Sequence, residues 1–143
     1  MNELLKRRTK VKTEASRRQH RAMEQHLDDL LCAIEANTHF LESFRKAHKL
    51  AAEHYRAEEE LLREIARHGA ALAKKMAAQH AEALEMAAAL EEAVAAGQAG
   101  DALRLARRFH AIAQHNIIEE ERDVFPLAEQ WDASGGGFGH GGV

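Results

Sequence analysis

The stretch that decides the fold is HYRAE, His54–Glu58, together with its echo HNIIE, His115–Glu119. Each stretch places a histidine four residues before a glutamate, in sequence rich in alanine, leucine, glutamate, lysine and arginine, which favour helix. Residues four apart project from the same face of a helix. A further histidine precedes each pair, His26 before the first and His80 before the second. The chain therefore contains two copies of one pattern, a histidine followed by a His-x-x-x-Glu pair.

Four helices are expected around these pairs, over about residues 13–36, 41–68, 70–96 and 102–130. Thr13 is expected to cap the first helix, and Asn37 interrupts it. Gly69 and Gly97 end the second and third helices. Pro126 should kink the fourth helix or end its regular part. Short connections between long helices predict antiparallel neighbours, and hence an all-α, up-and-down four-helix bundle.

The flanks of this bundle differ from it in composition. Residues 1–12 carry a run of basic side chains and are expected to form a flexible N-terminus. The bundle is expected over residues 13–131, and residues 132–143 form a glycine-rich flexible tail. At 143 residues the chain is long enough for one domain with a real core.

Charge and composition exclude several classes of function. A net charge of −3 argues against a nucleic-acid partner. No stretch reaches the ~18 apolar residues of a membrane span. The single cysteine, Cys32, allows no intrachain disulfide, and the charged N-terminus does not resemble a secretory signal. We expect a soluble cytoplasmic protein.

The predicted turns place the patterned residues at one height. In an up-and-down bundle, residues equally distant from a turn lie side by side. The midpoint of His26 and His54 falls near the first break, and that of Glu58 and His80 falls at the second. The midpoint of His80 and Glu119 falls in the third break. We therefore expect these side chains, with His115, in one layer, to within about one helical turn, ~5 Å.

Such a layer is suited to metal. Imidazole and carboxylate ligands suit iron, manganese or zinc, and buried charges are costly without a partner. With two metals, each glutamate can bridge and each metal takes two histidines. A bridging oxo or hydroxo group then leaves about two of roughly 12 octahedral positions open. A single His–Glu pair is more often a surface contact, and His20, which precedes Glu24 by four residues, is expected to face solvent.

The repeated pattern resembles the hemerythrin family in its bacterial branch, over roughly residues 20–130. The matching residues are His26, His54, Glu58, His80, His115 and Glu119. The run from Glu119 to Leu127 also looks like the end of that family's last helix. The resemblance implies a four-helix bundle with a non-heme di-iron site, two bridging glutamates, and chemistry with dioxygen or hydrogen peroxide.

One departure from the oxygen-carrying members bears on function. Those members have a fifth histidine on the third helix, four residues after the first, where this chain has Leu84. Tyr55, beside His54, could supply a phenolate ligand instead. His110 is a poorer substitute, because its five-residue spacing from His115 turns it about 140° around the helix.

The missing histidine predicts redox turnover, such as catalase-like peroxide breakdown, in place of oxygen carriage. The alternatives are an oxygen carrier, or a sensor of oxygen, iron or nitric oxide, in a monomer or weak homo-oligomer. A ferritin-like site is disfavoured, because that class uses Glu-x-x-His and no histidine here follows a glutamate at that spacing. A purely structural bundle would leave the layer unexplained.

Overall fold

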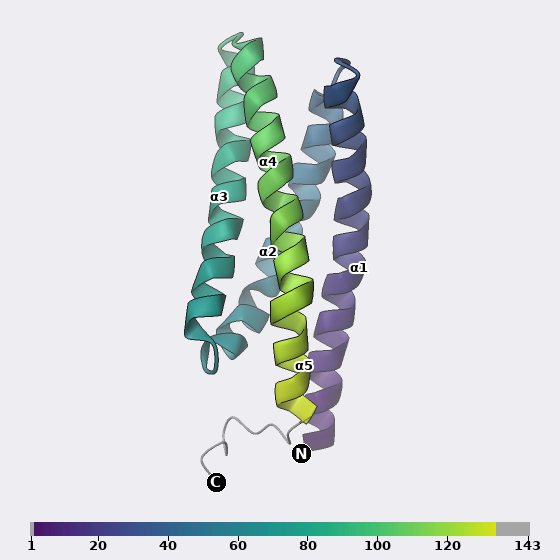
Figure 1. Cartoon of the computed structure of the whole chain (residues 1–143), viewed down its shortest axis with the longest axis vertical. Coiled ribbons are helices and arrows are strands. Elements are labelled where there is room, and N and C mark those ends of the chain that lie inside the picture. Colours follow the sequence, from purple (N-terminus) through teal and green to yellow (C-terminus); the bar gives the residue numbers. More distant parts are fainter. Residues whose placement is uncertain (1, 134–143) are drawn as a thin grey trace.

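The computed structural model describes the backbone of residues 2–133 and the side chains of residues 12–130. The helices are α1 (Asn2–Glu35), α2 (Leu41–Ala66), α3 (Ala70–Ala95) and α4 (Ala99–Glu119), followed by a π-helical segment, η1 (Glu120–Val124), and α5 (Phe125–Ala133). The last three elements form one continuous rod, which runs antiparallel to both α1 and α3 (Figure 1). The predicted all-α, up-and-down four-helix bundle is confirmed.

Helices α1 and α3 end where the backbone turns left-handed. Asn37, after α1, has φ 53°, and Gly97, after α3, has φ 72°. Both residue types tolerate this conformation, which a helix cannot continue. These are the first and third breaks predicted from the sequence.

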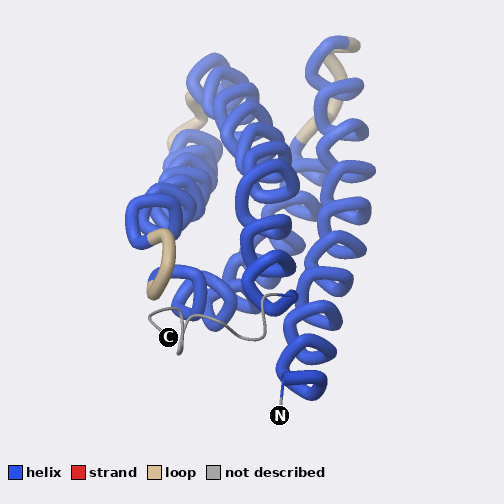
Figure 2. The backbone as a smooth tube through the Cα atoms, turned by 60° about the horizontal axis from the view of Figure 1, so that its bottom comes forward, coloured by secondary structure: helices blue, strands red, loops and turns tan. Residues whose placement is uncertain are grey.

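The N-terminal half of α1 differs from the prediction. Helix α1 begins at Asn2, so residues 2–12 of the segment expected to be flexible form its first turns, which are rich in leucine, lysine and arginine, all good helix formers. Thr13 is consequently not a cap but lies inside α1. Its hydroxyl donates to Glu129 of α5 at 2.8 Å, where the two helices lie side by side (Figure 2). The tail from residue 134 onward lies outside the described residues.

Each helix buries one residue in every three or four, along one stripe. In α1 the stripe is Thr13, Ser16, His20, Met23, Leu27, Leu30 and Ile34. In α2 it is Phe44, Ala47, Ala51, His54, Glu58, Leu61 and Ile65. In α3 it is Ala73, Met76, His80, Ala83, Ala87 and Leu90. Along α4 and η1 it is Ala102, Ala106, Phe109, Ala113, Asn116, Glu120 and Val124.

The stripes build two separate apolar cores. The larger core surrounds Phe44, Leu90 and Phe109, toward the α1–α2 and α3–α4 connections at the top of Figure 1. The smaller core surrounds Ile65 and Phe125, toward the α2–α3 connection. On α2, α3 and the fourth rod, polar stripe positions lie between the residues of the two cores. The polar residues therefore share one level of the bundle.

Candidate metal centre

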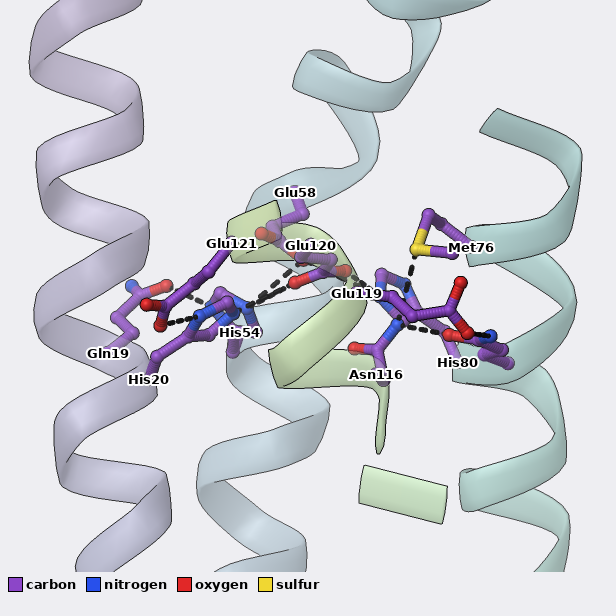
Figure 3. Close-up of polar contacts among 11 residues, drawn as sticks. Gln19, His20, His54, Glu58, Met76, His80, Asn116, Glu119, Glu120 and Glu121 are labelled. Atoms are coloured by element: carbon purple, nitrogen blue, oxygen red, sulfur yellow. Dashed lines mark hydrogen bonds and ion pairs between the residues drawn. The ribbon is translucent and has the colours of Figure 1, made fainter. Parts of the chain in front are cut away.

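Five polar side chains meet at the junction of the two cores, and we call them the polar layer. They are His20 of α1, His54 and Glu58 of α2, His80 of α3 and Glu120 at the start of η1 (Figure 3). Four of them are at most 1 % exposed, whereas His80 is 7 % exposed. All four rods of the bundle contribute, so the layer exists only in the folded chain.

Glu120 lies at the centre of this layer. Its Oε1 is 2.8 Å from Nε2 of His20, and its Oε2 is 2.7 Å from Nε2 of His80. The Oε1 atom of Glu58 is 3.0 Å from Nε2 of His54 and 3.5 Å from Nε2 of His80. Both carboxylates thus lie between imidazoles of different helices, as shared ligands would.

Two histidines are held by partners on their outer nitrogen. The Nδ1 atom of His20 donates to Glu121 Oε2 at 2.8 Å, and Nδ1 of His54 donates to Gln19 Oε1 at 2.5 Å. A hydrogen bond at one ring nitrogen sets the orientation and tautomer of the ring. Both rings therefore direct Nε2 at the carboxylates.

The π-helical turn explains why consecutive glutamates reach the same ring. Pro126 has no N–H, and its ring would clash with the carbonyl of the residue four positions earlier. The helix widens before it, and the N–H of Phe125 donates to the carbonyl of Glu120, at the five-residue spacing of a π-helix. Glu120 and Glu121 then contact the two opposite nitrogens of His20. The predicted disturbance at Pro126 is this widened turn.

The charges of the layer are strongly coupled. Burial lowers the pKa of His54, but hydrogen bonds and charge from Glu120 and Glu58 outweigh burial and raise it to about 9. Burial raises the pKa of Glu120, but hydrogen bonds from His20, His54 and His80 bring it well below its usual range. The pKa of Glu58 is raised, first by burial and then by the charge of Glu120. Without metal, a proton on His54 supplies positive charge in the layer.

Two buried polar atoms of this region, Oη of Tyr55 and Oδ1 of Asn116, have no hydrogen-bond partner among the described residues. Buried polar atoms without a partner are rare and destabilising. One donor atom from each of His20, His54, Glu58 and Glu120 lies within 4.8 Å of all the others. Nitrogen and carboxylate oxygen atoms that converge in this way fit a cation.

The structure brings together only part of the predicted ligand set. His54, Glu58 and His80 lie in the layer, and Tyr55 stacks on His80 with ring centroids 4.0 Å apart. His26 is half-buried and lies outside the layer.

The predicted pair His115 and Glu119 also lies outside the layer. Glu119 is buried, but its carboxylate pairs with Lys75 at 2.6 Å, with Gln79 at 2.8 Å and with His115. The side chains of His115 and Lys75 are 62 % and 57 % exposed. We call these four residues the outer cluster. Hydrogen bonds from Lys75 and Gln79 keep the pKa of Glu119 below its usual range against the opposing effect of burial.

His20 and Glu120 occupy the places that the spacing pattern assigned to His26 and Glu119. The prediction that His20 faces solvent is wrong, because it lies on the buried stripe three residues before Met23. His26 precedes the stripe residue Leu27 by one position, so its side chain points about 100° around the helix from that of Leu27. The break between the end of α1 and the start of α2 is centred on residue 38, whereas the midpoint of His26 and His54 is residue 40. This shift favours the earlier histidine.

The same rotation separates the two glutamates of the fourth rod. The buried stripe runs through Ala113, Asn116 and Glu120, and each of His115 and Glu119 precedes a stripe residue by one position. One position turns a side chain by about 100°. The spacing of the buried residues along this rod was thus the signal that identifies Glu120. The four-residue spacing of His115 and Glu119 pointed to the neighbouring glutamate instead.

The third helix supplies a single imidazole to the layer. Four residues before His80, on the same face, the buried residue is Met76, and four residues after it is the half-buried Leu84. Burial lowers the pKa of His110, and the charges that act on it are those of Asp28 and Glu35 of α1. His110 therefore belongs to the α1 side of the larger core and not to the layer.

A family model matches this chain: the hemerythrin HHE cation-binding domain, over residues 11–130. The chain belongs to this family. The hemerythrin-like domain includes the whole polar layer and the outer cluster, and the resemblance predicted from the His-x-x-x-Glu pairs is confirmed. Neither the curated proteins nor the solved structures contain a match. Among the described residues, no helix is long and apolar enough to cross a membrane.

Proposed function

We propose that the polar layer binds two iron ions, and that this centre breaks down hydrogen peroxide. The observation that carries the proposal is the position of Glu58 and Glu120, each between histidines of different helices. The family is one of cation-binding domains, which supports a metal at this place.

The donor set suggests how two ions would share the layer. His20, His54 and His80 would hold the ions together with the carboxylates of Glu58 and Glu120, and an oxo or hydroxo group would complete the centre. Zinc favours closed sites with four ligands, whereas three imidazoles and two carboxylates leave positions open on a pair of ions. A pair of iron ions supplies two-electron redox chemistry with dioxygen or peroxide. The preference for iron over manganese rests on the family resemblance.

The protein residues contribute orientation, charge and exclusion of water. Gln19 and Glu121 hold the rings of His54 and His20. The two buried carboxylates place negative charge beside the ions, which favours the ferric over the ferrous state. A stable ferric state opposes reversible oxygen carriage and suits peroxide turnover.

Oxygen binding without turnover is the second candidate. The observation that favours it is the burial of four of the five residues to 1 % exposure or less. Exclusion of water protects a bound ligand from side reactions.

The test is anaerobic loading of the purified chain with ferrous iron, followed by elemental analysis and an oxygen-electrode assay with hydrogen peroxide. We expect two iron ions per chain, a near-ultraviolet band of the oxidised form, and oxygen evolution. His80→Ala should lower the iron content to one or none, and His39→Ala, at an exposed histidine, should leave it unchanged. Two iron ions with no oxygen evolution, and a spectrum reversed under vacuum, would support the carrier. Absence of iron in the wild-type chain refutes both.

A further inference from the structure

A groove between α2 and α3 leads from the surface to the polar layer. Its volume is about 380 Å³, and its lining includes Tyr55 and His80 together with the small or apolar residues Ala77, Ala81 and Leu84. A water molecule takes up about 30 Å³ of liquid. The groove is therefore large enough for a peroxide-sized molecule and its hydration.

The layer opens to solvent at the same place. His80 is 7 % exposed, whereas His20, His54, Glu58 and Glu120 are 0 to 1 % exposed. A small molecule that approaches the layer along this groove meets the His80 side of the centre first.

Tyr55 stands at the inner end of this groove with an unused hydroxyl. Its ring lies parallel to that of His80, with centroids 4.0 Å apart and an angle of 11° between the planes. The side chain is 3 % exposed, and Oη has no hydrogen-bond partner among the described residues. A buried hydroxyl without a partner is destabilising, so this position requires an explanation.

We propose that the α2–α3 groove admits a small oxygen- or nitrogen-containing ligand, of the size of peroxide or azide, to the His80 side of the centre, and that the Tyr55 hydroxyl donates a hydrogen bond to it. This inference rests on the proposed function, because it assigns the approach and the polar partner of the ligand to that centre. This role differs from the metal-binding phenolate predicted from the sequence. Tyr55 keeps its proton and contacts the bound small molecule, and it does not coordinate the metal.

Small side chains of α3 form one wall of the groove. Ala77 and Ala81 lie one helical turn apart on α3, on either side of His80, and leave space that larger residues would fill. Tyr55 and Leu84 contribute ring and aliphatic carbon. A larger side chain at Ala81 should therefore narrow this groove beside His80.

The experiment is a spectroscopic titration of the iron-loaded protein with azide, combined with stopped-flow association kinetics. Tyr55→Phe keeps the stacked ring and removes the hydroxyl, and we expect its azide Kd to rise roughly 5- to 10-fold, as for loss of one hydrogen bond. Ala81→Leu should slow azide association at least about 5-fold. Ala78→Leu, at an exposed alanine of α3 outside the groove lining, is the matched control and should bind azide like the wild type. Iron content is measured in every variant.

Three results would overturn the inference. The first is normal iron content with azide Kd unchanged in Tyr55→Phe and association unchanged in Ala81→Leu. The second is a broad visible band of the azide-free ferric protein that Tyr55→Phe abolishes, which would identify Tyr55 as a phenolate ligand. In both cases the di-iron proposal stands. The third is absence of iron from the wild-type chain, which removes this inference together with the proposed function.

Discussion

Glu119 and Glu120 are adjacent in sequence and both buried, yet they belong to regions of opposite character. Glu119, in the outer cluster, is neutralised by Lys75, a permanent and exposed cation. Glu120, in the polar layer, accepts hydrogen bonds from the Nε2–H protons of His20 and His80. A metal ion can replace those protons, but it cannot easily displace a tethered ammonium group. The rotation of about 100° between neighbouring residues decides which glutamate is available to metal.

The largest expected effect separates these two glutamates directly. Glu120→Gln should weaken iron binding by more than about 100-fold, beyond the effect typical of an outer-shell partner. Glu119→Gln removes an equal charge one residue away and should retain two iron ions per chain. Elemental analysis after desalting measures both. A larger loss of iron in Glu119→Gln than in Glu120→Gln would place the metal centre at His115 and Glu119, as the spacing pattern predicted.

The same comparison applies to the first helix. His20→Ala should lower the iron content from two ions to one or none, because it removes an imidazole that contacts Glu120 at 2.8 Å. His26→Ala is matched in residue type and helix and should bind iron normally. Loss of iron in His26→Ala alone would show that α1 is rotated relative to the structure described above.

Removal of metal should destabilise the layer and leave the outer cluster unaffected. An ion present at about 100 times its Kd stabilises the folded state by about 2.7 kcal/mol, or about 8 °C in Tm for a domain of this size. Chelation should lower the Tm of the wild type and of Glu119→Gln by this amount. Glu120→Gln should show no such change in differential scanning calorimetry.

The stability of the metal-free protein should depend on pH through His54. Its pKa is raised from 6.5 to about 9, so the stabilisation from its protonated form is complete below pH 6.5 and is lost as the pH rises through about 9. Urea unfolding between pH 6 and pH 9.5 should show this loss in the metal-free wild type. The iron-loaded protein, in which imidazole binds metal without that proton, should lack it. An equal loss in both forms would place its origin outside the layer.

The smallest effect is expected in the outer cluster. Lys75→Met breaks the ion pair with Glu119, but the lysine side chain is 57 % exposed and Gln79 still donates to the carboxylate. We expect a decrease of about 1 kcal/mol or less in the free energy of unfolding, and unchanged iron content. A decrease in iron content would connect the outer cluster to the metal centre through Gln79 and Asn116.

The predicted placement of the side chains in one layer matches the structure where a His–Glu pair and the apolar stripe coincide, and differs from it elsewhere. On α2, His54 and Glu58 are stripe residues, and the sequence identified both. On α1 and the fourth rod, the spacing pattern pointed to His26 and Glu119, each one position before a residue of the stripe, Leu27 and Glu120. Local spacing establishes that two residues share a face of one helix. It does not establish which face the rest of the bundle covers.

The amino-acid sequence by itself determined that this chain is helical and where the three breaks between its four helical rods lie. It also determined that imidazoles and carboxylates recur near one height of the bundle. Helix propensity, glycine and asparagine at the breaks, and the spacing of apolar residues are local properties. Only the tertiary structure decided that Glu120, and not Glu119, meets the histidines, and that the layer opens toward Tyr55 and His80. These outcomes depend on helix rotation and on the widened turn before Pro126, which arise when four rods bury their stripes against one another.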